Sequence, residues 1–323
     1  MRAVRLHEVG GPEVLRVDDV DVPDPGPGEI RVRIEAAGLN FIDTYHRDGK
    51  YPVELPASIG VEAGGVVDAV GPGVTTVSEG DRVAYTGQRG SYAEQQVVPV
   101  DAVVTLPDQV DTKTAVAALL QGMTAHYLTH DTYPLQPGDT ALLHAAAGGA
   151  GHLLTQVCKL RGARIIATCG TKEKADFVRG LGADEVVVYT EEKFTDAVER
   201  FTDGRGVDVV YDGVGKATFL DGLKCLRPRG MMVLYGQASG PVDPVDPQEL
   251  NRLGSLFLTR PMLFHYIAER RDLERRASDL FGWIAKGEIA VRIDRTFALE
   301  EAADAHRYLE GRETLGKVLL LPE

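Results

Sequence analysis

Residues 140–161, TALLHAAAGGAGHLLTQVCKLR, contain the stretch that decides the fold of this chain. Thr140 to Leu143 is a short apolar run typical of a buried strand, and His152 to Arg161 is typical of a helix. Between them lies HAAAGGAG, in which Gly148 and Gly151 take the second and third glycine positions of a GxGxxG pattern. A strand, a glycine-rich turn and a helix in this order predict a site for dinucleotide phosphates at the helix N-terminus.

Each position in this turn meets a physical demand of that site. Ala146 takes the first glycine position, Gly148 lets the backbone approach a pyrophosphate, and Gly151 lets the helix pack closely on the strand. The residues we expect to contact the cofactor here are Ala147, Gly148, Gly149 and Ala150.

The remainder of the chain shows two kinds of organisation. Up to about Leu106, short β-like runs such as Ile30–Ala36 and Val61–Val70 are separated by proline and glycine turns, which predicts a small barrel. From about Thr112, helical segments alternate with apolar runs, which predicts βαβ units and a parallel sheet. The predicted strands of that sheet are Thr140–Leu143, Arg164–Thr168, Val186–Tyr189, Val207–Tyr211 and Gly230–Tyr235. A helix at Asp272–Ala285 and a strand at Lys317–Leu321 follow, and we expect this strand to return to the first domain.

Composition narrows the class of protein. A chain of 323 residues predicts two domains, and a net charge of -13 argues against a general nucleic-acid or anionic-membrane partner, which favours a small-molecule substrate. Cys158, Cys169 and Cys225 form no CxxC pair, so we expect reduced thiols. We see no targeting segment and no apolar run long enough to span a membrane, and we therefore expect a cytoplasmic protein.

The second strand of the parallel sheet bears on the choice of cofactor. NAD-binding proteins commonly carry an acidic residue at its end to bind the adenosine ribose. Here Arg164–Thr168 runs into Cys169-Gly170-Thr171, which has no acid. Small residues leave room for a 2′-phosphate and Lys174 offsets its charge, so the sequence favours NADPH over NADH, although Glu173 opposes this.

Motifs along nearly the whole chain resemble the zinc-free quinone oxidoreductases, the ζ-crystallin-like branch of the medium-chain dehydrogenase/reductase superfamily. The segments that carry the resemblance are Ala36–Tyr45, Gly60–Gly65, Glu79–Val83, the AAAGGAG turn, Tyr211–Gly215 and Leu258–Pro261. The resemblance implies an α/β fold in which a Rossmann doubly wound parallel sheet (residues 119–261) interrupts a GroES-like β-barrel catalytic domain (1–118 and 262–323). It also implies an active site between these domains and a homodimer.

The resemblance also implies roles for individual residues. Lys174, Tyr189 and Arg312 match the positions that hold the 2′-phosphate of NADPH, and Asn40, Thr124, Gly236 and Gln237 lie near those that meet its nicotinamide half. The further cofactor-binding positions are Gly170, Gly213 and Arg260. Without the resemblance, Tyr189 would be a strand end and Arg312 a surface charge. Gln237 and Thr124 are equally well explained as satisfied polar groups of a loop and a helix cap.

The resemblance separates this chain from the zinc-dependent alcohol dehydrogenases of the same superfamily. Their catalytic cysteine and histidine ligands correspond here to Asn40 and Val61, which are poor zinc ligands. The segment between Val83 and Tyr92, where a structural zinc lobe would lie, contains no cysteine, and no HxH or HExxH pair occurs. We therefore expect no zinc and an acceptor that is already electron-poor.

Quinones meet this requirement, because they take hydride from nicotinamide C4 without metal activation, and the protein's task is then to position the reactants. We expect Tyr45 and Tyr51 to line the substrate pocket, Asn40 to donate a hydrogen bond to a developing oxyanion, and Asp43 to support the loop. His46 is another possible donor, although we expect it at the surface. Single-electron transfer stays open, as does whether any side chain supplies a proton.

Two other functions remain possible at this stage. A zinc-free NADPH-dependent alkenal or enone reductase needs only a differently shaped pocket on the same architecture. The resemblance also admits an NADPH-binding structural protein of crystallin type or an RNA-binding protein. The negative charge and the lack of an aromatic and basic RNA signature count against RNA.

Overall fold

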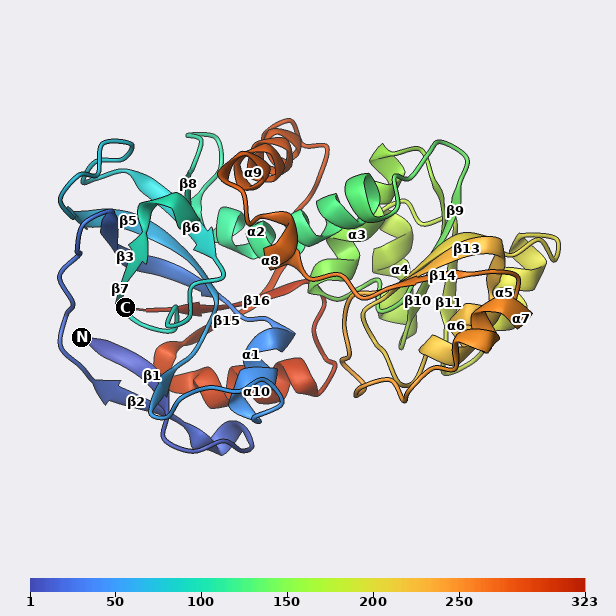
Figure 1. Ribbon diagram of the computed structural model, residues 1–323, viewed down its shortest axis with the longest axis horizontal. Helices are drawn as coiled ribbons and strands as arrows, with labels where there is room; N and C mark the ends of the chain where they lie inside the picture. Colours follow the sequence, from blue (N-terminus) through green and yellow to red (C-terminus); the bar gives the residue numbers. More distant parts are fainter. Residues whose placement is uncertain (323) are drawn as a thin grey trace. The chain divides into compact units, whose positions relative to one another are not determined.

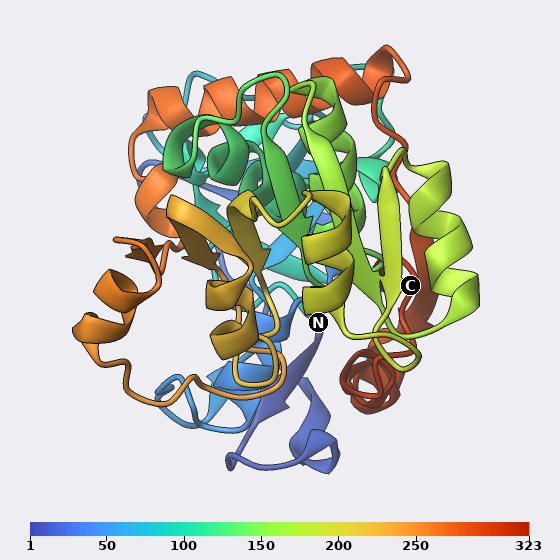
Figure 2. The same ribbon diagram turned by 90° about the vertical axis from the view of Figure 1, so that its right-hand side faces the viewer.

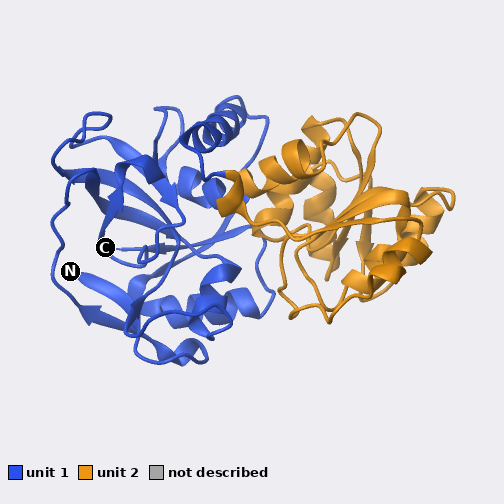
Figure 3. Cartoon of the chain, in the orientation of Figure 1, with its two compact units in different colours: residues 1–121, 267–323 blue, residues 122–266 orange. Residues whose placement is uncertain are grey.

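The computed structural model describes residues 1–322 and divides into two compact units (Figure 3). Unit 1 comprises Met1–Gln121 and the segment that begins at Ile267, and unit 2 comprises Gly122–Tyr266. The helix α2 (Thr112–Tyr127) continues through the first of these boundaries. The division lies a few residues after the expected domain boundaries at 118 and 261, and its second boundary follows α8 (Leu263–Tyr266).

Unit 2 is built on a six-stranded sheet of order β11-β10-β9-β12-β13-β14, with every neighbouring pair parallel (Figure 1). The order reverses between β9 and β12, which is the doubly wound arrangement. The strands are β9 (Thr140–Leu143), β10 (Arg164–Cys169), β11 (Glu185–Val188), β12 (Val207–Asp212), β13 (Leu226–Leu234) and β14 (Phe257–Thr259).

Helices lie on both faces of this sheet (Figures 1 and 2). They are α3 (Gly149–Leu160), α4 (Lys172–Gly180), α5 (Phe194–Phe201) and α6 (Phe219–Lys224), followed by α7 (Pro247–Arg252) and α8, while a π-helix (Leu128–Thr132) continues α2. Every residue of β9 and of β12 is buried, as expected for central strands covered on both sides. The predicted parallel sheet is therefore confirmed.

Unit 1 contains two sheets. The larger has the order β15-β16-β3-β5-β6-β8 with β7 on β3, and the smaller has the order β2-β1-β4. Their strands are β1 (Arg2–Leu6), β2 (Leu15–Asp19), β3 (Glu29–Gly38), β4 (Ala57–Ser58), β5 (Glu62–Val70), β6 (Arg82–Thr86), β7 (Gln95–Pro99), β8 (Val103–Thr105), β15 (Ile293–Ala298) and β16 (Lys317–Leu321). Because β16 pairs antiparallel with β3, the predicted return of the C-terminal strand to the first domain is confirmed.

Further helices complete unit 1. They are α1 (Phe41–Arg47), α9 (Arg270–Ala285) and α10 (Ala302–Glu310), with 3₁₀ segments at Pro12–Val14, Val100–Ala102 and Leu299–Glu301. Aliphatic residues of β1, β3 and β5 form its core together with Leu299, Ala305 and Leu309 near α10. Among residues 1–322, no helix combines the length and apolar character needed to cross a membrane.

Candidate functional site

In unit 2 the chain turns sharply between β9 and α3. Ala145 has a φ of 54°, so the left-handed position of this turn is held by alanine and not by one of the glycines. Gly148 is the N-cap of α3, which begins at Gly149, three residues before the predicted start at His152. A Cβ on Gly151 would lie 2.3 Å from the carbonyl oxygen of Ala145, so this glycine does allow close packing of the helix, against the turn after β9 and not against the strand itself.

The N-terminus of α3 lies at the carboxyl end of β9, where the strand order of the sheet reverses. Ala147 is buried, and Gly148, Gly149 and Ala150 are half-buried. The first turn of a helix has unpaired backbone N–H groups and a positive dipole end, so this turn can accept an anion.

The neighbouring strand β12 ends in a second ordered turn. Oδ1 of the buried Asp212 accepts hydrogen bonds from the backbone nitrogens of Val214 (2.7 Å) and Gly215 (2.9 Å). A Cβ on Gly236 would lie 2.4 Å from the carbonyl oxygen of Gly213, so the chain after β13 packs closely on the chain after β12. Gly213 and Gly236 thus belong to one tightly packed turn region beside β9.

At the end of β10, Gly170 lies beside Tyr189, and the helix that carries Lys174 begins two residues later. A Cβ on Gly170 would lie 2.7 Å from the hydroxyl oxygen of Tyr189, and Thr171 caps α4 by accepting a hydrogen bond from the backbone nitrogen of Lys174 (3.2 Å). Tyr189 as a whole is 49% exposed. This corner therefore offers a hydroxyl, with no carboxylate in Cys169-Gly170-Thr171, and the first turn of the following helix carries both Lys174 and Glu173. The missing acid removes the usual partner of a free ribose.

The other predicted cofactor residues lie in several segments. Thr124 is buried on α2, Gln237 is half-buried after β13, and Arg260 is exposed after β14, where its Nη1 donates to the carbonyl oxygen of Pro261. Arg312 is an exposed residue of unit 1 with a φ of 58°. The residues of unit 2 fit a dinucleotide with an additional phosphate, while the share of Arg312 stays a prediction.

In unit 1, Asn40 and Asp43 shape the start of α1. Asn40 is the N-cap residue, and its backbone nitrogen donates to Oδ2 of Asp43 (2.9 Å). The hydroxyl of Tyr92 donates to the same oxygen (2.9 Å). Asp43 is fully buried and thus supports the loop, as the sequence indicates.

The side-chain amide of Asn40 is surrounded by partners. Its Nδ2 donates to the carbonyl oxygen of Gly38 (3.1 Å) and to Oε2 of Glu62 (2.9 Å). Its Oδ1 accepts from Nζ of Lys317 (2.8 Å) and from Nε2 of Gln121 (3.2 Å). Both N–H groups and both lone pairs are therefore in use, so donation to a substrate oxyanion, as we expected from the sequence, would require one of these bonds to break.

Asp43 is the first of a series of buried titratable groups that contact one another. Burial raises the pKa of Asp43 to about 7 and raises that of Tyr92, while burial, with the nearby Arg47 guanidinium, lowers the pKa of His306 to about 3. Nη1 of Arg47 lies 3.1 Å from Nδ1 of His306. Because a guanidinium only donates, Nδ1 accepts and the ring proton is on Nε2, which lies 3.4 Å from the hydroxyl oxygen of Tyr92.

Aromatic side chains gather at the C-terminal end of α1. The rings of Tyr45 and Tyr51 meet edge to face with centroids 5.4 Å apart, and His46 lies 5.8 Å from Tyr51. His46 is half-buried, with its ring edge to face against Tyr51. Burial and the nearby Arg89 lower the pKa of His46, which favours the neutral imidazole.

The residues at the positions where alcohol dehydrogenases hold catalytic zinc do not fit this metal. Val61 has no donor atom, and the Asn40 oxygen is occupied by the Lys317 ammonium, whose positive charge opposes a divalent cation. Within residues 1–322, no group of three or more His, Cys, Asp or Glu side chains is arranged to hold a metal ion.

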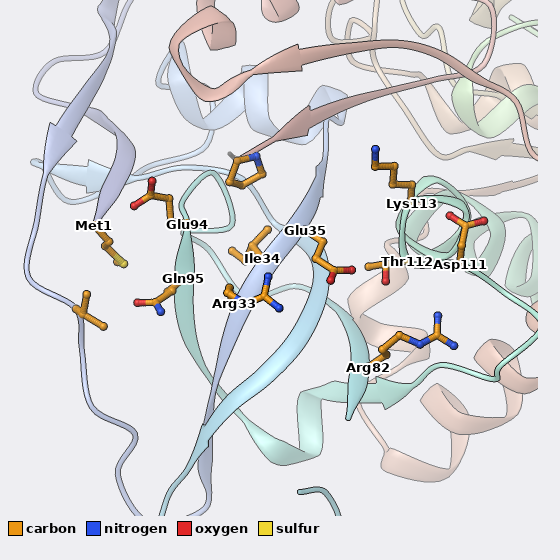
Figure 4. Close-up of a pocket in the computed structure, with 12 residues that line it drawn as sticks. Met1, Arg33, Ile34, Glu35, Arg82, Glu94, Gln95, Asp111, Thr112 and Lys113 are labelled. Carbon is orange, nitrogen blue, oxygen red and sulfur yellow. The ribbon is translucent and has the colours of Figure 1, made fainter. Parts of the chain in front are cut away.

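A separate pocket of 770 Å³ in unit 1 contains none of the predicted site residues (Figure 4). It is lined by Met1, Val22, Arg33, Ile34, Glu35, Arg82, Glu94, Gln95, Asp111, Thr112, Lys113 and Pro322. Glu94 is already paired with Arg2, and Arg82 donates to the carbonyl oxygens of Pro107 and Val110. These charges therefore stabilise the barrel.

Comparison with known proteins identifies the family. Residues 26–108 match the family described as alcohol dehydrogenase GroES-like domain, and residues 181–320 match the family described as zinc-binding dehydrogenase. The quinone oxidoreductase of Pseudomonas aeruginosa is 46% identical, with 99% of each chain covered. This chain belongs to the quinone oxidoreductase family. The resemblance predicted from the motifs is confirmed, as is the fold class of a Rossmann sheet with a GroES-like barrel.

Two further relatives of this chain bear on its substrate and its cofactor. The 2-haloacrylate reductase of a Burkholderia species is 42% identical, again with 99% of each chain covered. The Escherichia coli quinone oxidoreductase, solved as a complex with NADPH, superposes with a TM-score of 0.98 at 41% identity over 100% of both chains.

Sequence reasoning missed three residues of the buried network. Glu62, Lys317 and Gln121 were not among the predicted site residues, although all three bond to Asn40. Glu62 gave one signal, because a carboxylate in the apolar run Val61–Val70 requires a buried partner. The sequence gave no sign that Lys317 is buried, since a lysine at the start of a strand is ordinarily exposed.

Proposed function

We propose that this protein is an NADPH-dependent reductase that transfers hydride from nicotinamide C4 to quinones, planar electron-poor acceptors, without a metal. The observation that carries the proposal is the helix N-terminus at the strand-order reversal of unit 2. Beside it, the end of β10 has no acid, Lys174 follows on α4, and the hydroxyl of Tyr189, which follows β11, lies next to Gly170. The names and the NADPH complex of the family members support it.

The proposal assigns most cofactor contacts to the Rossmann domain, residues 119–261, and the substrate to the barrel segments 1–118 and 262–323, which also contribute Asn40 and Arg312 to the cofactor. The turn Ala147–Ala150 holds the pyrophosphate through backbone amides other than that of Gly148, which already donates to the carbonyl oxygen of Ala145, and Lys174, Tyr189 and Arg312 hold the 2′-phosphate. The residues proposed for the remaining cofactor contacts are Asn40, Thr124, Gly170, Gly213, Gly236, Gln237 and Arg260.

The chain's own residues supply position and surroundings for the acceptor. Tyr51 is half-buried and offers a ring on which a flat acceptor can stack, while Tyr45, only 7% exposed, packs edge to face against it and holds it in place. Asn40 and Asp43 fix the start of the helix that carries Tyr45, so we assign both a positioning role. Holding reactants in the right geometry is a large source of rate acceleration, and a quinone needs no Lewis acid.

The 2-haloacrylate reductase supports a second candidate function, reduction of an activated carbon–carbon double bond by the same route. The test measures oxidation of NADPH and of NADH with 1,4-benzoquinone, 2-chloroacrylate and a 2-alkenal. We expect NADPH with benzoquinone to give the highest kcat/KM. Faster turnover of an alkene by orders of magnitude would select the second candidate, and a preference for NADH would reject the proposed cofactor.

We also propose a homodimer formed through β14. This strand is the edge of the sheet in unit 2, and the apolar side chains of Phe257 (54%), Leu258 (38%) and Met262 (39%) near it are exposed. An open, apolar strand edge is a ready site for pairing with a second copy. Sedimentation of the Phe257→Lys variant tests this, since a charge on the edge is expected to give monomers.

We propose a cytoplasmic location, because Cys158, Cys169 and Cys225 are free and buried, as is usual in a reducing compartment. Fractionation of the source cells tests this location.

A further inference from the structure

A fully buried ion pair lies in the core of unit 1, next to Asn40. Nζ of Lys317 is 2.6 Å from Oε2 of Glu62, and both side chains are 0% exposed. The two residues come from β16 and β5, and Asn40 joins them from the end of the segment that follows β3. Three segments distant in the sequence thus meet at one amide.

We infer that Lys317 is a positioning residue that, together with Glu62, holds the Asn40 amide in a single orientation and so fixes α1, which carries Tyr45, and the adjoining Tyr51 for the quinone. This inference rests on the proposed function.

The chemistry of the partners determines the orientation of the amide. An ammonium group can only donate hydrogen bonds and a carboxylate can only accept them. Lys317 therefore requires the oxygen of Asn40 on its side, and Glu62 requires the nitrogen on the other side. A flipped amide would place N–H against ammonium and oxygen against carboxylate, so it would lose both bonds.

Stability alone does not account for this pair. Removing two charges from water costs several kcal/mol per ion, and well-packed apolar residues in place of a buried pair are often neutral or stabilising. A buried charge pair that sets one arrangement of a polar group has a role that apolar residues cannot supply. In this chain the polar group is the N-cap residue of α1.

Short contacts connect the ion pair with the tyrosines that we propose to contact the substrate. Asn40 precedes α1, which carries Tyr45, and the backbone nitrogen of Tyr51 donates to the carbonyl oxygen of Tyr45 (2.9 Å). Glu62 also accepts a hydrogen bond from the backbone nitrogen of Leu120 (2.6 Å), which ties α2 to the same carboxylate. The ion pair thus secures both helices that border Asn40.

The test is the double variant Lys317→Met/Glu62→Gln, which removes both charges and leaves none buried without a partner. We expect a circular dichroism spectrum like that of the wild type. We also expect kcat/KM for 1,4-benzoquinone to fall at least tenfold, and the Kd of NADPH without quinone to change less than threefold. The matched control is Arg31→Met/Asp68→Asn, which removes a partly exposed pair between β3 and β5 and is expected to leave kcat/KM unchanged.

A second measurement reports on the amide independently of activity. In protein labelled with ¹⁵N-asparagine, the Asn40 side-chain NH₂ signal, assigned by its loss in Asn40→Ser, is expected to be protected from solvent exchange. In the double variant, the protection of this NH₂ group from solvent exchange should fall at least tenfold. Retained protection, or wild-type kinetics in the folded double variant, would overturn the inference. If the wild type reduces no quinone, the proposed function fails, and the exchange measurement still decides whether Lys317 orients Asn40.

Discussion

The hydroxyl of Tyr92 donates a hydrogen bond of 2.9 Å to Oδ2 of Asp43, inside the core of unit 1. The same oxygen accepts from the backbone nitrogen of Asn40, while Oδ1 has no partner among residues 1–322. Two donors on one oxygen do not offset complete burial, so the pKa of Asp43 rises to about 7. The carboxyl group that shapes the start of α1 thus titrates near neutral pH.

The first prediction concerns Asp43→Asn. Burial raises the pKa of Asp43 above its ordinary 3.8, so its contribution to stability is fully present below pH 3.8 and is lost as the pH rises through about 7. Asparagine keeps an oxygen for Asn40 and Tyr92 and does not titrate. We therefore expect the variant's free energy of unfolding, relative to the wild type, to increase between pH 4 and pH 8. Urea unfolding at several pH values measures this, and a constant difference would contradict it.

The second prediction concerns His306→Gln, for which stability changes with pH in the opposite direction. The pKa of His306 falls from 6.5 to about 3 in the folded protein, so the unfolded chain binds the proton more readily. Wild-type stability should therefore decrease below pH 6.5, by at most about 1.4 kcal/mol per pH unit. Glutamine can accept from Arg47 and donate to Tyr92 without titrating, so the variant should lose less stability in acid. The exposed His265→Gln serves as the control and is expected to follow the wild type.

The parallel sheet could be predicted because its central strands are continuous apolar runs, buried on both faces. The strand β14 was missed, since it has only the three residues Phe257–Thr259 and two of them are exposed. The helix α3 begins earlier than predicted, because Gly149 and Gly151 are poor helix formers whose positions are set by packing on the turn.

The candidate site was predictable where it is local in sequence. Gly170 and Lys174 follow one strand, and the gap left by the missing acid is visible in the sequence. The network around Asn40 is not local, because Lys317 and Glu62 are 255 residues apart in the chain. No pattern within either segment shows that an ammonium and a carboxylate share one amide.

The third prediction concerns Lys174→Ala. If Lys174 binds the 2′-phosphate, its loss removes a charge-assisted hydrogen bond worth about 1.5–3 kcal/mol, which raises the KM for NADPH roughly 10- to 100-fold. The KM for NADH should change little, because this coenzyme lacks the phosphate. The control is Lys172→Ala, two residues earlier, whose ammonium is exposed and paired with Glu191. Steady-state kinetics with both coenzymes would reveal an error if the two variants behaved alike.

The fourth prediction concerns Gly170→Ala, which tests the shape of the same corner. The new Cβ would lie 2.7 Å from the Tyr189 hydroxyl oxygen, and this exposed phenol can swing away without disturbing the core. We therefore expect unchanged thermal unfolding and a several-fold higher KM for NADPH, because Tyr189 leaves the position that we assign to phosphate binding. Gly180→Ala is the matched control, since nothing lies within 4 Å of its new Cβ at the end of α4. Calorimetry and coenzyme kinetics on both variants decide the matter, because an unaltered KM in Gly170→Ala would separate Tyr189 from the cofactor.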